Sequence, residues 1–314
     1  GLLNRLPERW QQAGAVAVGL PLLVVAAISP FRYIAPAYAD PPIVDQVPEG
    51  AVPVGLSFNG FEIVAVAAES VTVEEGGRVP VTLYVRANGL LDTNYSLYLH
   101  ALGRNGDEIG KIDTYPGGGA LPTSHMQPGA IYADRYSLEL EPEFEAPTIV
   151  RVAIGAGLRT GDQYIILNGQ MPDGSEIPSV AIHAGVAYPA DESHCVGLAP
   201  EDATVNATVG GFARLWAAPL DVAASPGEAV PVTLYWDRLA DTPVDWTVFV
   251  HLVDADGSIA AQADGPPLNG AYPTSLWRRA CQFADVHTLQ LPGEIPAGTY
   301  RVTAGMYNAA DPAY

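Results

Sequence analysis

The chain has 314 residues, enough for about two domains of ordinary size. Hydrophobic residues make up 48% of it and charged residues only 16%, a composition that excludes intrinsic disorder for most of the chain. The formal net charge is −20, with 35 acidic and 15 basic residues, which argues against nucleic acid as a partner because phosphates would be repelled. The 32 glycines and 28 prolines follow no collagen-like period and indicate many turns between short strands.

The N-terminal region contains an uncharged apolar run over residues 13–28, preceded by Arg5 and Arg9 and followed by Arg32. A helix rises ~1.5 Å per residue, so the run alone covers roughly 24 Å of a hydrocarbon core ~30 Å thick. Extending it to residue 34 gives sufficient length. We therefore predict one transmembrane helix over residues 13–34, which would contact membrane lipid.

The arginines also predict an orientation for this helix. Two precede the apolar run and one follows it, which places residues 1–12 in the cytoplasm as a short tail and the bulk of the chain outside the membrane. A cleaved signal peptide is the alternative, because Ala37-Tyr38-Ala39 fits the small-residue cleavage pattern. Both interpretations predict an extracytoplasmic chain.

The remainder of the chain contains an internal repeat. The sequence VPVTLY occurs at residues 79–84 and again at residues 230–235, an offset of 151. The same offset relates further pairs, namely Gly60 and Gly211, His100 and His251, Asn105 and Asp256, Pro122 and Pro273, and Asp134 and Asp285. It slips by one residue near the end of the repeat, where Gly155 matches Gly305. A nearly gapless match over about ninety residues indicates a tandem duplication.

Each copy has the pattern of an antiparallel β-domain. Tyr95, Leu97 and Leu99 alternate with residues of the opposite face, as do Trp246 and Val248 in the second copy. Such period-two alternation is typical of a strand with one buried face, and turn signals recur every ~8–12 residues. We predict a mainly β protein with two tandem immunoglobulin- or fibronectin-like β-sandwiches after the transmembrane helix.

The composition along the chain divides it further. Residues 35–53 are rich in proline and predict an extended stalk, followed by a first sandwich at 54–187, a linker at 188–205 and a second sandwich at 206–314. The first copy continues into another hairpin for which the second copy has no counterpart. We therefore expect the second sandwich to lack its last strands, either because the chain is truncated or because another chain supplies them by strand addition.

The two cysteines, Cys195 and Cys281, belong to a chain expected to be exported. They predict either one disulfide, which would close 86 residues, or two free thiols. Neither a CxxC nor an HxxxH pattern occurs, so we expect no zinc site and no cofactor. No nucleophile elbow or phosphate-binding glycine loop is present, and we assign no catalytic residue.

The most distinctive loop lies at residues 265–277 (GPPLNGAYPTSLW) and carries Asn269, Tyr272 and Trp277. Its aromatic side chains could stack on a sugar ring or contact a partner. They could equally fill the end of the second sandwich. We keep the three residues as a candidate ligand or partner loop.

Several segments carry a resemblance to a known family. VPVTLYW, WTVFVHLVDADG, DGPPLNGAYPTSLW and PAGTYRVTAGMY, together with RYIAPAYADPP at residues 32–42, resemble the C-terminal extracytoplasmic module of bacterial membrane glycosyltransferases of the dolichyl-phosphate-mannose mannosyltransferase type (family 39). In that family the catalytic acidic residues lie in the first extracytoplasmic loop of the transmembrane part. This sequence contains no such part, so the resemblance implies no catalytic residue here.

These observations favour a non-enzymatic protein of the cell membrane. We expect a single-pass accessory or interaction subunit that binds other subunits of a membrane or cell-surface assembly through its sandwiches or its helix. One alternative is the C-terminal tail of a polytopic glycosyltransferase. Another is a carbohydrate-binding module, with a glycan as ligand.

Overall fold

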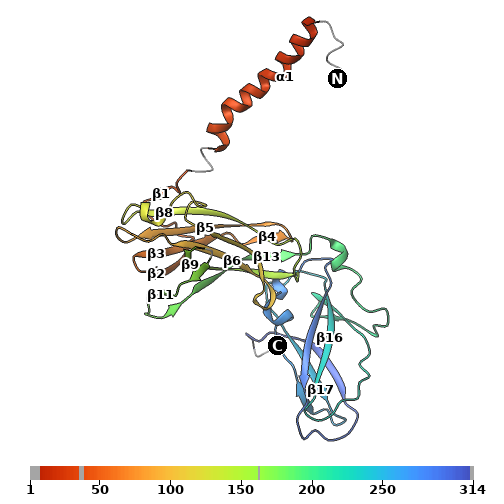
Figure 1. Cartoon of the computed structure of the whole chain (residues 1–314). Helices are drawn as coiled ribbons and strands as arrows, with labels where there is room; N and C mark the ends of the chain where they lie inside the picture. Colours follow the sequence, from red (N-terminus) through yellow and green to blue (C-terminus); the bar gives the residue numbers. More distant parts are fainter. Residues whose placement is uncertain (1–7, 35–38, 162, 312–314) are drawn as a thin grey trace.

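The computed structural model describes residues 8–34, 39–161 and 163–311. Strands account for 47% of the structure and helices for 11%, which confirms the predicted mainly β class. One long helix precedes two bodies that each consist of two β-sheets, and the connection from one body to the other runs through residues 189–204 (Figure 1).

The helix α1 (Glu8–Ser29) continues into a short π-helix, η2 (Pro30–Ile34), and points away from both sandwiches (Figure 1). Its described apolar side chains are exposed; Leu23, for example, retains 69% of its surface and Phe31 of η2 retains 80%. Among the described residues, no helix combines the length and the apolar character that crossing a membrane requires. The predicted transmembrane helix over residues 13–34 is therefore not supported here.

Sandwich 1 contains a sheet of seven strands in the order β1-β8-β5-β3-β2-β11-β12 and a second sheet in the order β4-β13-β9-β6-β7, with β10 paired to β9. The strands are β1 (Ile43–Val44), β2 (Val52–Phe58), β3 (Phe61–Ala68), β4 (Val71–Glu74), β5 (Arg78–Ala87), β6 (Ser96–Leu102), β7 (Glu108–Thr114), β8 (Ile131–Glu139), β9 (Thr148–Thr160), β10 (Gln163–Ile166), β11 (Gly169–Gln170), β12 (Glu176–Ile177) and β13 (Ser179–Tyr188). Alternate residues of β5 and β8 face the core between the sheets, since successive side chains of a strand point to opposite faces.

Sandwich 2 is smaller and has sheets in the orders β14-β15-β16-β19 and β18-β17-β20. The strands are β14 (Val205–Val209), β15 (Ala213–Ala217), β16 (Ala229–Arg238), β17 (Thr247–Val253), β18 (Ile259–Gln262), β19 (Phe283–Gln290) and β20 (Arg301–Tyr307). Its core is built around large aromatic side chains, among them Trp236 and Trp277, and β19 alternates strictly between buried and exposed residues. Short 3-10 turns occur in both bodies and in the connection between them: η3 (Arg104–Gly106), η4 (Thr123–His125), η5 (Glu192–Cys195), η6 (Pro267–Gly270) and η7 (Thr274–Leu276).

The internal repeat corresponds to matching strand registers. His100 pairs with Ala153 across β6 and β9, and His251 pairs with Thr303 across β17 and β20. The one-residue slip of the repeat brings a glycine opposite the aromatic residue of the neighbouring strand in both copies. A Cβ atom at Gly155 would lie 2.5 Å from the Tyr98 hydroxyl, and one at Gly305 would lie 2.7 Å from the Phe249 ring. Only glycine leaves room for these rings.

The predicted stalk at residues 35–53 is not a free spacer where the structure describes it. Strand β1 forms the edge of the seven-stranded sheet and pairs with β8, and the Ala133 amide donates a hydrogen bond to the Pro42 carbonyl at 2.9 Å. Val44 and Ala51 pack in a small apolar cluster on the outer face of the seven-stranded sheet. The proline-rich segment is therefore fixed to the surface of sandwich 1.

Candidate interaction site

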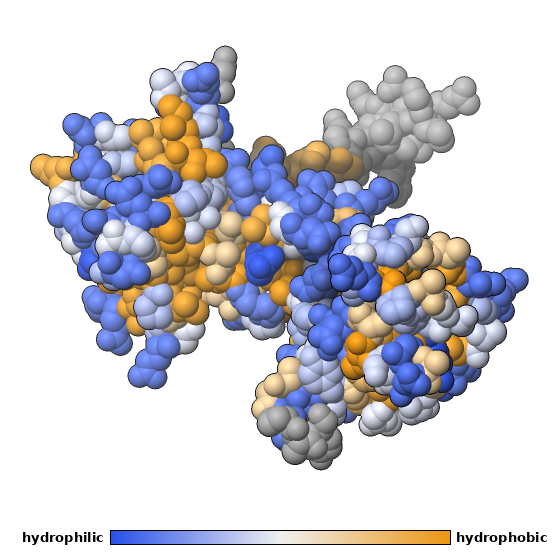
Figure 2. Space-filling view, turned by 90° about the horizontal axis from the view of Figure 1, so that it is seen from below, coloured by the Kyte–Doolittle hydropathy of each residue, from blue (hydrophilic) through white to orange (hydrophobic). Residues whose placement is uncertain are grey.

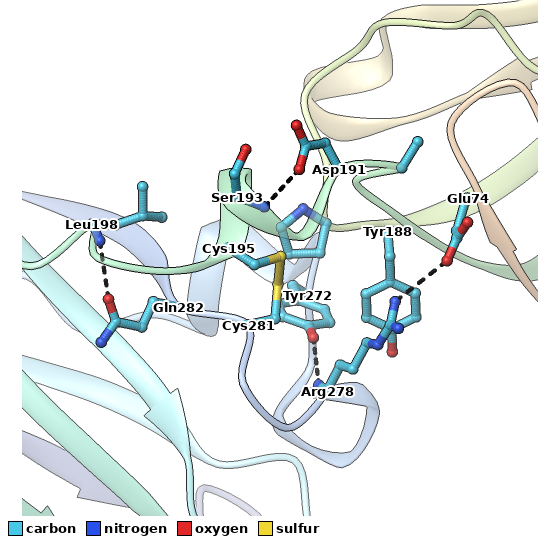
Figure 3. Close-up of a disulfide and its surroundings, with 12 residues drawn as sticks. Glu74, Tyr188, Asp191, Ser193, Cys195, Leu198, Tyr272, Arg278, Cys281 and Gln282 are labelled. Carbon is cyan, nitrogen blue, oxygen red and sulfur yellow. Dashed lines mark hydrogen bonds and ion pairs between the residues drawn. A yellow bond between two sulfur atoms is a disulfide. The ribbon is translucent and has the colours of Figure 1, made fainter.

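A disulfide lies at the junction between the sandwiches and ties the linker to sandwich 2. Cys195, at the end of η5, and Cys281, just before β19, form a buried disulfide (Figure 3). Next to it, the Gln282 amide donates to the Cys195 carbonyl at 2.5 Å, and the Leu198 amide donates to the Gln282 side-chain oxygen at 3.0 Å. The predicted linker at residues 188–205 is thereby fastened to sandwich 2.

Side chains from both sandwiches interlock beside this disulfide (Figure 3). Tyr188, the last residue of β13, donates its hydroxyl proton to the Leu276 carbonyl at 2.5 Å and places its ring edge-on to Tyr272, with centroids 6.0 Å apart. The Arg278 guanidinium lies over the Tyr188 ring and 3.6 Å from the Glu74 carboxylate. The loop at residues 265–277 thus joins the two sandwiches.

The structure buries two of the three candidate loop residues and leaves the third exposed. Tyr272 and Trp277 retain 0% and 1% of their surface, so neither ring offers a face for a sugar. The Trp277 indole donates to the Tyr272 carbonyl at 2.9 Å and packs against Phe283 with centroids 4.9 Å apart. The aromatic pair caps the core of sandwich 2. Asn269 is exposed and lines a cavity of about 260 Å³ together with Arg104.

The buried carboxylate of Asp285 holds the loop at residues 265–277 through a hydrogen bond to its backbone. Asp285 of β19 accepts a hydrogen bond from the Leu268 amide at 3.0 Å and contacts the His287 imidazole at 3.0 Å. Burial by itself would lower the pKa of His287. The hydrogen bond and charge of Asp285 and the hydrogen bond to the Ala263 carbonyl outweigh burial, so the pKa is raised above its usual value.

Sandwich 1 has an equivalent buried aspartate, whose side-chain partner is a tyrosine instead of a histidine. Asp134 accepts from the Gly117 amide at 2.8 Å and from the Tyr136 hydroxyl. Burial raises the pKa of Asp134, although both hydrogen bonds oppose the shift; burial and the nearby Asp134 charge raise the pKa of Tyr136. The aspartate of the repeat is thus a structural residue in both copies, and His287 takes the position of Tyr136.

The variant His287→Tyr should remove one pH-dependent component of stability. Because the folded-state pKa of His287 is raised, the stabilisation from its protonated form is complete below the ordinary histidine pKa of ~6.5 and is lost as pH rises through the higher folded-state value. Thermal unfolding of wild type and variant between pH 5.5 and 8.5 measures this. We expect the wild type to lose stability relative to the variant as pH rises; parallel profiles would contradict the assignment.

Sandwich 2 also has an apolar groove of about 1290 Å³. It lies between residues 217–224, the start of β16, and the segment that leads into β20. Leu220 and Val222 at its rim keep 44% and 58% of their surface, and Figure 2 shows apolar surface (orange) on this sandwich at the right of the view. Sequence reasoning did not single out these residues, although the repeat offset that aligns Val222 with Val71 of β4 would have located the rim.

No protein-family model matches the chain, and no curated protein is significantly similar to it. Within the described part of the chain, no three or more histidine, cysteine or acidic side chains gather in a way that could hold a metal ion. The fold defines the class here: a mainly β protein with two joined sandwiches.

Proposed function

We propose that this chain is a non-catalytic accessory subunit that binds another protein of a membrane or cell-surface assembly through sandwich 2. The apolar groove carries the proposal. Most residues that line it are apolar, and Leu220 and Val222 at its rim expose aliphatic surface that a bound partner would shield from water. The contacts of Tyr188 with Leu276 and Tyr272 support it, because they join sandwich 2, which carries the groove, to sandwich 1.

A site-specific photo-cross-linker tests this proposal in the native membrane. Placed at Leu220 on the groove rim, it should yield a single cross-linked product of fixed mass. Placed at Ile259, which is 52% exposed and lies outside the groove, it should yield none. Equal products from both positions, or none from either, would contradict an interaction through the groove.

Membrane attachment through residues 13–34 is a further part of the proposal. The apolar side chains of α1, among them Leu22 and Val25, are exposed, and their contact with water is unfavourable. Lipid would bury these side chains. The disulfide fits an oxidising compartment outside the cytoplasm. The arginines before and after the run favour a cytoplasmic N-terminus.

Removing residues 1–38 should release the protein from membranes. We expect the full chain to remain in the membrane pellet after alkaline carbonate extraction, and the shortened chain to appear in the supernatant with the same near-ultraviolet circular dichroism from its sandwiches. A full chain that carbonate extracts completely would exclude lipid embedding and leave a peripheral attachment.

The resemblance to the exported module of membrane mannosyltransferases supports a more specific version of this function, in which the sandwiches act beside a membrane glycosyltransferase, within the same polypeptide or as a separate subunit. The intact mass of the protein from its native source distinguishes the two arrangements. A mass near 33.0 kDa fits a separate subunit, and a much larger mass with hydrophobic peptides upstream of Gly1 fits a tail.

A further inference from the structure

A cavity of about 260 Å³ lies at the junction of the two sandwiches, beside the loop at residues 265–277. Both sandwiches contribute residues to its lining: Arg104, Asn105 and Glu145 from sandwich 1, and Leu268, Asn269 and residues 284–286 from sandwich 2. Strand β20 takes no part in it. The cavity therefore exists only while the two sandwiches are held together.

Backbone strain concentrates at this cavity. In the described part of the chain, five residues other than glycine have a positive φ angle, and three of them line the cavity. They are Asn105, Leu268 and Asn269, with φ angles of 58°, 50° and 54°. The left-handed region is unfavourable for residues with a side chain, and such strain clusters at ligand-binding and catalytic sites.

The fold itself does not require side chains at two of these positions. The repeat offset aligns Leu268 and Asn269 with Gly117 and Gly118, whose φ angles are 71° and 62°. Both turns are anchored in the same way, by a backbone amide that donates to the buried aspartate of the repeat. Glycine adopts this conformation without strain, so the turn alone does not explain why sandwich 2 has a leucine and an asparagine here.

The leucine and the asparagine differ in what they contact. Leu268 is 8% exposed and packs in the core of sandwich 2, which accounts for its presence. Asn269 is exposed, and among the described residues its carboxamide has no hydrogen-bond partner. The same is true of Asn105 on the sandwich 1 side of the cavity. Two carboxamides from different sandwiches are thus available to one ligand.

The charges at the cavity disfavour an ion as this ligand. The Arg104 guanidinium donates to the Pro147 carbonyl at 3.0 Å and lies 3.4 Å from the Glu145 carboxylate. Burial lowers the pKa of Arg104, and the charges of Glu145 and Asp285 oppose that shift, so two carboxylates already act on one guanidinium. No positive charge is left for an anion, while the guanidinium repels a cation.

We propose that this cavity binds one uncharged sugar ring, either a free sugar or the terminal residue of a glycan. Each carboxamide both donates and accepts hydrogen bonds, Glu145 accepts them and Arg104 donates them, which matches hydroxyl groups that do both. Val286, at 52% exposure, offers aliphatic surface to the C–H groups of the ring. The volume is below the ~300–1,000 Å³ of sites for drug-sized ligands and suits a single ring.

Methyl glycosides of glucose, galactose, mannose and N-acetylglucosamine serve as probes, with the full chain in a detergent that has no sugar head group. We expect at least one of them to shift the side-chain amide resonances of Asn105 and Asn269 in isotope-labelled protein. The shift should saturate with a Kd of about 1 mM, because a ligand of this size makes few contacts. The side-chain amide of Asn59, outside the cavity, should not shift.

Variants on the two sides of the cavity locate the site. Asn269→Gly removes the carboxamide at a position where glycine adopts the same φ angle, and it should weaken binding about tenfold. Asn59→Gly is the matched control, because Asn59 is also exposed and has a φ of 39°, and it should bind as the wild type does. Arg104→Lys keeps the charge but removes the planar guanidinium, and it should also weaken binding about tenfold.

A disaccharide with the bound ring at its non-reducing end distinguishes the two sources of the ring. Binding at least as tight as that of the methyl glycoside assigns the cavity to the end of a glycan, and loss of binding assigns it to a free sugar.

Two results would overturn the inference. One is the absence of a saturable shift with all four glycosides at concentrations about fiftyfold above the expected Kd. The other is equal binding by the wild type, Asn269→Gly and Arg104→Lys. The cross-link at Leu220 tests the proposed function independently, because Leu220 does not line this cavity.

Discussion

Trp277→Ala should lower the free energy of unfolding of sandwich 2 by about 3–5 kcal/mol, the usual loss for a large aromatic side chain removed from a core. The residue is 1% exposed and packs between Trp236 and Phe283, so its loss leaves a cavity that these rings cannot fill. It also removes the indole donor to the Tyr272 carbonyl. Urea unfolding followed by intrinsic fluorescence measures the change.

Trp216→Ala is the matched control for this variant. Trp216 lies on β15, is only partly buried and has the Arg214 guanidinium near its ring, so its removal should cost about 1 kcal/mol or less. Glycan binding should be the same for both variants and for the wild type. A stable Trp277→Ala protein with reduced glycan binding would restore the sugar-stacking interpretation of the loop.

Cys195→Ser combined with Cys281→Ser should lower the free energy of unfolding by about 2–5 kcal/mol, since the bridge closes 86 residues and restricts the unfolded chain. The double substitution also removes the covalent link between residues 189–204 and sandwich 2 in the native structure. Residues 189–204 should become sensitive to limited proteolysis, because in the wild type the disulfide and the contacts of Gln282 hold this segment.

The wild type treated with a thiol reductant provides the control for the double variant. Reduction should reproduce the same loss of stability and the same new cleavage sites, and reductant should leave the double variant unchanged. Equal stability of the oxidised wild type and the double variant would show that the junction is held by the contacts of Tyr188 and Arg278 instead.

The strands could be predicted from the sequence because their signal is local. Alternation along residues 246–251 corresponds to the buried Val248 and Val250 of β17, and the offset of 151 then requires that both copies fold alike. The same alternation along residues 95–100 predicted the strand β6 but not its burial, because Ser96 and Tyr98 on the second face are buried as well. The slip of the offset before Gly305 has a physical reason that is visible only in the sheet, where this glycine lies beneath the Phe249 ring.

The fate of the loop at residues 265–277 could not be predicted in the same way. An exposed platform and a core cap need the same aromatic residues, and the choice depends on contacts with Tyr188, which is distant in the sequence. The pairing of β1 with β8 was missed for a similar reason. A proline-rich segment predicts an extended spacer. Its pairing with a sheet depends on β8, which is distant in the sequence and lies beside Ile43 only in the folded protein.

The attachment of β1 to sandwich 1 limits how far the protein can extend from a membrane. Only residues 35–42 separate η2 from β1, and a chain of that length spans roughly 30 Å at most. In the proposed attachment of α1 to the membrane, this short connection keeps sandwich 1 close to the lipid headgroups. Sandwich 2 lies on the side remote from α1 (Figure 1). A partner that binds the groove of sandwich 2, as proposed above, would then have to reach this outward position rather than lie within the bilayer.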